Sequence, residues 1–155
     1  MPATHVLGYR CPACGVERSY SPSEIVYTCT SCGGNLDLVF DYAAIRRDTP
    51  RHVGGEPSLW RYLPLLPVGD PGFEGTPLRS AGWTPLYRST RLEQRLGLNR
   101  LYIKDDGRNP TASFKDRASA VVVARGLELG VSRIVTASTG NAGAALAGMA
   151  AAAGM

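Results

Sequence analysis

Short apolar runs alternate with helix-like patterns over the second half of the chain, residues 83–155. The runs at 101–104 and 133–137 are rich in β-prone residues and have the length of a buried strand. Helical patterns are expected over three ranges, which are 91–96, 113–129 and the alanine-rich 142–153. Strands that alternate with helices predict an α/β fold built on a parallel sheet with right-handed crossovers.

The first 82 residues follow a different pattern and divide into two parts. Residues 1–40 contain all four cysteines, and apolar runs at 25–27 and 36–40 predict strands that flank the second cysteine pair. Residues 41–82 are rich in proline, glycine and arginine, which indicates a connecting arm with one short helix around 59–66. The chain is therefore expected to contain a small N-terminal unit, a connecting arm, and the start of the α/β domain described above.

A capping pattern marks the start of the helix expected at 113–129. Ser113 and Asp116 have the S-x-x-D spacing of a capping box, and Pro110 stops any helix from entering from upstream. Gly130 is expected to end the helix. Lys115 is then expected as the second helical residue.

Lysine is scarce in this chain. Lys104 and Lys115 are the only lysines, and the rest of the seventeen basic residues are arginines. The plain interpretation of Lys115 is a solvated helix residue. A positive charge in the first turn is poorly matched to the helix dipole, however, and Phe114 beside it is an unusual surface residue, which favours a functional amine. Lys104 precedes Asp105 and Asp106, so it is expected to form an ion pair at the end of a strand.

A small polar loop follows the expected strand at 133–137, and its residues are Ser138, Thr139, Gly140 and Asn141. A strand, a polar turn and a helix N-terminus together form an anion site, because unpaired N–H groups point outward from the helix end. Ordinary helix capping is the alternative, since single hydroxyl groups at such places more often do only that. Combined with Lys115 on the preceding helix, the loop predicts a site that holds an aldehyde cofactor as an imine and binds an anionic substrate.

The cysteines form two C-x-x-C pairs, each followed by glycine, and predict a zinc ribbon. The expected ligands are Cys11, Cys14, Cys29 and Cys32. Four thiolates leave no open coordination position, so the zinc would be structural. Iron binding and two disulfides are the alternatives. Residues 1–20 have no apolar signal-peptide core, which favours a reducing cytoplasm over disulfides.

Charge and hydropathy argue against two classes of partner. The formal net charge is only +4, the arginines are scattered, and no aromatic-basic stripe suited to stacking bases is found, so nucleic-acid binding is not expected. A basic binding module led by the zinc ribbon remains the non-catalytic alternative. The apolar run at 142–155 is too short to cross ~30 Å of hydrocarbon, so no membrane partner is expected either.

Two motifs carry a family resemblance. The sequence N-P-T-A-S-F-K-D-R at 109–117, followed by A-S-T-G-N at 137–141, resembles pyridoxal-phosphate enzymes of the tryptophan synthase β fold type, and threonine synthases most closely. The segments at 58–62 and 82–86 are also similar to the N-terminal regions of threonine synthases, some of which carry a ribbon. Asp116 favours this subfamily, because related dehydratases more often have another residue after the lysine.

The resemblance implies pyridoxal 5'-phosphate as the cofactor and assigns roles to individual residues. Lys115 would form the imine with the cofactor and later move protons, Phe114 would line the ring pocket, and Asn141 would hydrogen-bond the ring oxygen. The loop residues implied to receive the carboxylate or phosphate of an amino-acid substrate are Ser138, Thr139 and Gly140. The implied reaction is that of a lyase in threonine and amino-acid biosynthesis, from O-phospho-L-homoserine and water to L-threonine and phosphate.

Two departures and two missing parts qualify the resemblance. Ala142 stands where many members have a hydroxyl residue and Ala118 where glycine is frequent, so a cysteate synthase or a serine/threonine dehydratase is the alternative. The glycine-rich cup for the cofactor phosphate and the polar partner of the pyridine nitrogen are not found. We therefore expect the N-terminal part, less than half, of a longer enzyme, inactive alone, from a truncated gene or a cloned fragment. The oligomeric state of the full-length enzyme, including a homo-oligomer, is left open.

Overall fold

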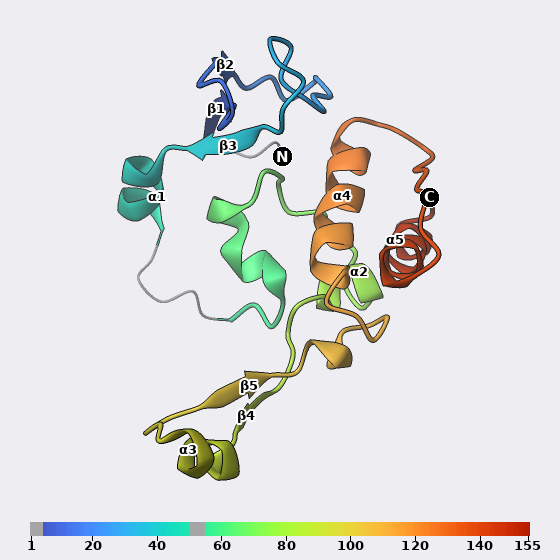
Figure 1. The fold of residues 1–155 in the computed structure, drawn as a ribbon. Helices are drawn as coiled ribbons and strands as arrows, with labels where there is room; N and C mark the ends of the chain where they lie inside the picture. The colour runs from blue at the N-terminus through green and yellow to red at the C-terminus, as the bar shows by residue number, and fades with distance from the viewer. Residues whose placement is uncertain (1–4, 50–54) are drawn as a thin grey trace.

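The structure is a computed structural model that describes residues 5–49 and 55–155. Parts of the expected ribbon and of the expected connecting arm, residues 1–4 and 50–54, lie outside the described residues. Figure 1 shows the N-terminal strands at one end, two long helices in the middle, and a hairpin with a short helix at the opposite end. The domain boundaries expected at residues 40 and 82 stay a prediction.

The N-terminal unit is a three-stranded antiparallel sheet in the order β2-β1-β3. Its strands are β1 (Val6–Arg10), β2 (Glu17–Ser19) and β3 (Asp37–Phe40). The expected strand at 36–40 is confirmed as β3, but the one at 25–27 is wrong, because these residues lie in a loop and Tyr27 is 84% exposed. The first two strands were not expected. Glycine interrupts one and the other is polar, so neither has a clear apolar alternation.

Three short helices link this unit to the rest. They are α1 (Tyr42–Asp48), the 3-10 helix η1 (Leu59–Leu65) and α2 (Pro77–Ser80). The short helix expected around 59–66 is confirmed as η1, which begins where the Ser58 hydroxyl accepts a hydrogen bond from Trp60 N at 3.1 Å. The 3-10 form fits Pro64, which cannot donate the hydrogen bond that a continuous α-helix needs.

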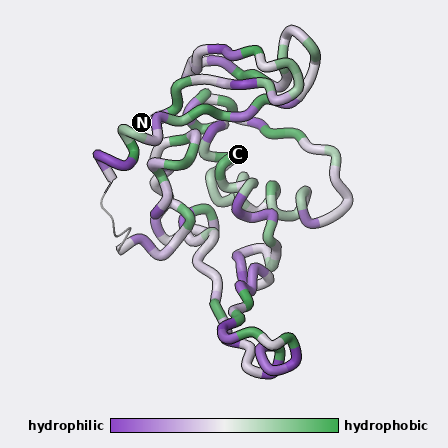
Figure 2. The backbone as a smooth tube through the Cα atoms, turned by 60° about the vertical axis from the view of Figure 1, so that its left-hand side comes forward, coloured by the Kyte–Doolittle hydropathy of each residue, from purple (hydrophilic) through white to green (hydrophobic). Residues whose placement is uncertain are grey.

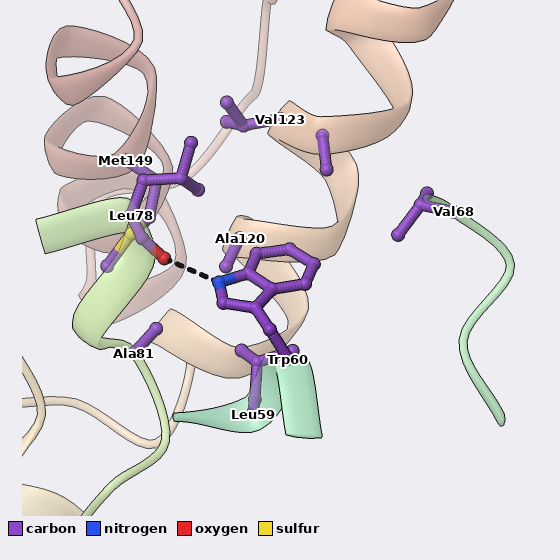
Figure 3. Close-up of a cluster of buried hydrophobic side chains, with 9 residues drawn as sticks. Leu59, Trp60, Val68, Leu78, Ala81, Ala120, Val123 and Met149 are labelled. Atoms are coloured by element: carbon purple, nitrogen blue, oxygen red, sulfur yellow. Dashed lines mark hydrogen bonds between the residues drawn. The ribbon is translucent and has the colours of Figure 1, made fainter. Parts of the chain in front are cut away.

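The hydrophobic core joins η1 and α2 to two long helices (Figure 3). Trp60 is 1% exposed, and its ring nitrogen donates to the carbonyl oxygen of Leu78 at 3.0 Å. The indole packs in the same cluster as Val123 and Met149, which come from the long helices α4 (Asp116–Glu128) and α5 (Asn141–Ala152). Full burial of one such aliphatic side chain stabilises the fold by about 1.5–3 kcal/mol. The segment around η1 is therefore part of the core.

A two-stranded antiparallel hairpin, β4 (Leu86–Arg88) with β5 (Tyr102–Lys104), projects from the body and encloses α3 (Thr90–Leu96). We call this hairpin with its helix the hairpin arm. The expected strand at 101–104 and helix at 91–96 are confirmed. The pairing is antiparallel, however, and both sheets of the described residues are antiparallel, so the expected parallel sheet is not observed there. Hydrophilic and hydrophobic stretches follow one another along the hairpin arm at the bottom of Figure 2.

The two long helices are α4 (Asp116–Glu128) and α5 (Asn141–Ala152), which pack against each other. Both were expected, although α4 begins three residues later than the expected N-cap. Ser113 accepts a hydrogen bond from the backbone N–H of Lys115 at 3.1 Å and so stabilises the turn before the helix. Lys115 is thus the residue before α4 and not its second residue.

The strand expected at 133–137 is absent, and residues 133–138 have no regular secondary structure. Val135 is 85% exposed. A buried parallel strand needs neighbouring strands to pair its backbone groups, and none lies beside this segment among the described residues. No helix in the described ranges is long and apolar enough to span a membrane.

Candidate functional site

The lysine motif folds into a compact loop, residues 109–117, which we call the lysine loop. Asp116 is fully buried, and its carboxylate accepts hydrogen bonds from the backbone N–H of Thr111 at 2.7 Å and from the Thr111 hydroxyl. Ala112 N donates to the carbonyl oxygen of Asn109 at 2.8 Å, and Ala112 adopts a left-handed conformation with φ +56°. The loop is therefore held in one shape by its own buried polar groups.

Lys115 lies at the end of this loop with an exposed side chain. Its Nζ atom is 4.8 Å from the ring centre of Phe114, within the range of a cation–π contact. Phe114 is 61% exposed, so it lies on the surface of the described chain, where the sequence argument had not placed it. The amine and the aromatic ring are thus presented side by side by a well-braced backbone.

The second predicted loop caps α5. The Ser138 hydroxyl accepts hydrogen bonds from the backbone N–H groups of Gly140 and Gly143 at 3.3 and 3.1 Å. Ser138 therefore caps the N-terminus of α5. Thr139, Gly140 and Asn141 are exposed, and Asn141 is the first residue of α5.

The lysine loop lies against the side of α5. A Cβ atom built on Gly148 would be 2.7 Å from the Thr111 methyl group, which shows how closely the two segments approach. Gly148 is seven residues along α5 from Asn141, or about 10 Å at 1.5 Å per residue. Lys115 and Asn141 share no hydrogen bond among the described residues. The structure thus brings the two predicted segments onto one pair of packed helices without a hydrogen bond between these side chains.

Charged groups beside the lysine loop were missed by sequence reasoning. The Arg117 guanidinium donates to both carboxylate oxygens of Asp106, from Nε at 2.9 Å and from Nη2 at 2.8 Å. These hydrogen bonds hold the pKa of Asp106 at about 2. The Thr84 hydroxyl also donates to Asp106, at 2.6 Å. Arg117 stands inside the motif, but nothing in the motif indicates which acid it meets.

No salt bridge of Lys104 is found among the described residues, although its positive charge, after the hydrogen bonds from Arg117 and Thr84, helps to lower the pKa of Asp106. The Lys104 Nζ atom donates to the backbone carbonyl oxygen of Thr84. Asp106 is engaged by Arg117, whose planar fork fits a carboxylate better than an ammonium group does. Lys104 therefore braces the backbone, and Lys115 is the lysine whose amine forms no hydrogen bond among the described residues.

The four cysteines meet at one point, and their Sγ atoms all lie within 4.8 Å of one another. The shortest pairs are Cys11–Cys32 at 3.5 Å and Cys14–Cys29 at 3.6 Å, and no disulfide joins them. A tetrahedral zinc with bonds of about 2.3 Å would place sulfur atoms about 3.8 Å apart. The spacing and the soft thiolate donors therefore fit a closed metal site.

Each C-x-x-C pair forms the same turn. Gly15 N donates to the Cys11 carbonyl and Gly33 N to the Cys29 carbonyl, both at 2.8 Å, and both glycines have a positive φ. Backbone N–H groups of Ser31 and Cys32 donate toward the Cys29 sulfur and lower its pKa to about 6. Thiolate character is what a metal ligand needs, so the second turn prepares the Cys29 sulfur for a cation.

Comparison with known proteins assigns the class. The family model described as "Pyridoxal-phosphate dependent enzyme" matches residues 78–155, which is half of the chain and includes the lysine loop and α5. The chain therefore belongs to the family of pyridoxal-phosphate dependent enzymes. The cofactor of this family is pyridoxal phosphate, and the exposed Lys115 amine fits its aldehyde group.

Three similar proteins are threonine synthases. The chain is 45% identical to a threonine synthase of Methanosarcina acetivorans over 139 residues, which cover 89% of this chain and 33% of that protein. It is also 45% identical to a threonine synthase of Methanocaldococcus jannaschii over 140 residues, which again cover 89% of this chain and 33% of that protein. The Synechocystis threonine synthase is 41% identical over 95 residues, which cover 61% of this chain and 24% of that protein. The chain spans about a third of the first two relatives. No solved structure matches it.

Proposed function

We propose that this chain is part of a threonine synthase, a lyase that converts O-phospho-L-homoserine and water into L-threonine and phosphate. The observation that carries the proposal is the free Lys115 amine at the end of a braced loop, inside the region that matches the pyridoxal-phosphate family. The 45% identity to two threonine synthases supports the reaction, because it extends over 89% of the chain.

The roles of the residues are those that the family resemblance implies. Lys115 would hold the cofactor at its aldehyde carbon through the Nζ atom and would then move protons at the substrate Cα and Cβ atoms. Phe114 would line the pocket of the cofactor ring, and Asn141 would hydrogen-bond the ring oxygen. The residues that receive the carboxylate or phosphate of the substrate are Ser138, Thr139 and Gly140. When bound, the cofactor supplies a ring that absorbs the carbanion charge.

The rest of the architecture belongs to the same proposal. The four-cysteine unit, residues 5–40, holds a structural zinc ion in a reducing cytoplasm, and the sulfur spacing supports the metal. Residues 133–137 supply a strand of a parallel sheet when neighbouring strands are present, since their backbone groups are unpaired among the described residues. A small-molecule amino acid, rather than a nucleic acid or a membrane, is the partner of the site.

The test uses the full-length protein with pyridoxal phosphate. Borohydride reduction should attach the cofactor to the peptide that contains Lys115, and K115A should lose both the label and the release of phosphate from phosphohomoserine. K104A is the matched control and should keep both. Label at Lys104 instead would contradict the site. Turnover of phosphoserine or threonine in place of phosphohomoserine would move the assignment to a cysteate synthase or a dehydratase.

A further inference from the structure

Both ends of the lysine loop are tied to one residue, Gly82. At the start of the loop, the Asn109 side-chain oxygen accepts a hydrogen bond from the backbone N–H of Gly82 at 2.9 Å. At the end, Arg117 Nη2 donates to the carbonyl oxygen of Gly82 at 3.1 Å. Lys115 lies between these two bonds. Two hydrogen bonds to Gly82 thus hold both ends of the loop that carries the amine. We call Gly82 with these two bonds the Gly82 tie.

The Gly82 tie has little room to move. Gly82 has φ +92°, and a Cβ atom there would lie 2.8 Å from Leu59 Cβ and 2.9 Å from Arg117 Nη1. Leu59 is 5% exposed, and its backbone N–H donates to the carbonyl of Ala81 at 2.7 Å. The tie is therefore fixed to the hydrophobic core, and the position of Arg117 is fixed with it.

Asp106 completes the arrangement from the other side. Its carboxylate binds Arg117 at two atoms, and the Thr84 hydroxyl holds the carboxylate in turn. Because the hydrogen bonds from Arg117 hold the pKa of Asp106 at about 2, the pair is charged at neutral pH. A bidentate pair fixes the direction of a guanidinium group as well as its distance.

We propose that Arg117 is a positioning residue for Lys115, and that with Asp106 and Gly82 it fixes the direction in which the loop presents the amine. Lys115 directly precedes α4 but has helical backbone angles, φ −67° and ψ −17°. Arg117 is two residues further on, which is about 200° around a helix, so the two side chains leave on different sides. Arg117 therefore acts through the backbone and not by touching the reacting atoms. The inference rests on the proposed function, because it assumes that Lys115 receives the cofactor.

The test measures how fast Lys115 captures pyridoxal phosphate in the full-length protein, without substrate. Samples are reduced with borohydride at intervals, and the Lys115 peptide is quantified by mass spectrometry. R117K keeps the charge but cannot form the bidentate pair, and D106N removes the carboxylate charge. Both should slow capture at Lys115 on the order of tenfold, since small displacements of a reacting group are costly.

The hairpin arm offers a matched control. Arg88 and Glu93 form the same kind of bidentate pair, with distances of 2.9 and 3.0 Å, away from the lysine loop. R88K and E93Q remove a comparable pair and should leave capture within about twofold of the parent protein. Capture by R117K and D106N as fast as by these controls would overturn the inference.

Two further outcomes are separable. If the parent protein captures no cofactor at Lys115, the proposed function fails together with its site. If R117K and D106N do not fold, as judged by thermal unfolding, T84V removes the hydroxyl that donates to Asp106 and accepts from Arg117, and it keeps a side chain of similar shape. T84V should slow capture in a folded protein, and unchanged capture would again reject the positioning role.

Discussion

At the scale of single residues, Ala112 is the most unusual position near the amine. It is one of two non-glycine residues with positive φ among the described ranges, and its backbone N–H is bonded to Asn109. A left-handed conformation costs a residue with a Cβ atom about 1–2 kcal/mol. The buried bonds of Asp116 to Thr111 hold the loop in this conformation despite the cost.

Replacing this alanine should therefore stabilise the protein. We expect A112G to raise the free energy of unfolding by about 0.5–1 kcal/mol, because glycine removes the strain but also gains freedom in the unfolded chain. Urea denaturation of the full-length protein measures the change. A118G is the control, since Ala118 lies inside α4 and should lose about 1 kcal/mol on the same change. Equal destabilisation by both variants would show that Ala112 is not strained.

At the scale of elements, helices were more predictable than strands. The ranges of α3, α4 and α5 follow from periodicity and from local residues such as Gly97 and Gly130, which have positive φ where the helices end. Strand formation depends on partners that are distant in sequence, so the runs at 25–27 and 133–137 look like strands but form none.

The residues of the candidate site divide in the same way, into those that stand in local motifs and those whose partners are distant in sequence. Lys115 and the cysteines stand in local motifs and could be found from the sequence. The Gly82 tie could not, because it joins Gly82 to Arg117 across 35 positions of the chain. Asp106 was missed for a similar reason, since Lys104 was expected to pair with an acid that follows it, whereas Asp106 binds Arg117.

The packing of the lysine loop on α5 gives a prediction at this scale. G148A would place a methyl group 2.7 Å from the Thr111 methyl, and Thr111 cannot move away because Asp116 holds its N–H and hydroxyl. We expect a loss of about 1–3 kcal/mol in the free energy of unfolding, which is typical of overpacking. The control is G140A, because a Cβ atom there meets nothing within 4 Å. A stable G148A protein would mean that the loop is not packed on α5.

At the scale of the whole molecule, α4 connects the four-cysteine unit to the lysine loop. Arg125 Nη2 donates to the backbone carbonyl of Glu24 at 3.2 Å, and the same guanidinium lies 5.6 Å from the ring centre of Tyr20. Lys115 is at the other end of this helix. The four-cysteine unit therefore contacts the helix that follows the amine, but its contact is far from the lysine loop.

Metal removal should affect the four-cysteine unit and leave most of α4 unchanged. We expect chelation of zinc from the full-length protein to raise hydrogen exchange across residues 5–40, because the stability of a small unit with four cysteine ligands comes mainly from the metal. Exchange within α4 should rise only near Arg125, since Ala120 and Val123 are buried in the core. C14S should give the same pattern without chelator. Unchanged exchange in residues 5–40 after metal loss would contradict a structural role for zinc.

The hairpin arm leaves the body at Thr84 and returns at Asp106, and a 2.6 Å hydrogen bond joins these two residues directly. Next to it, Asp105 N donates to the Pro85 carbonyl at 3.0 Å. The twenty or so residues in between thus form a projecting segment whose two ends are joined by hydrogen bonds. The length and tip of this segment can therefore be changed without disturbing the amine, and a fluorophore or tag inserted near Gly97 should leave the chemistry of the body unaltered.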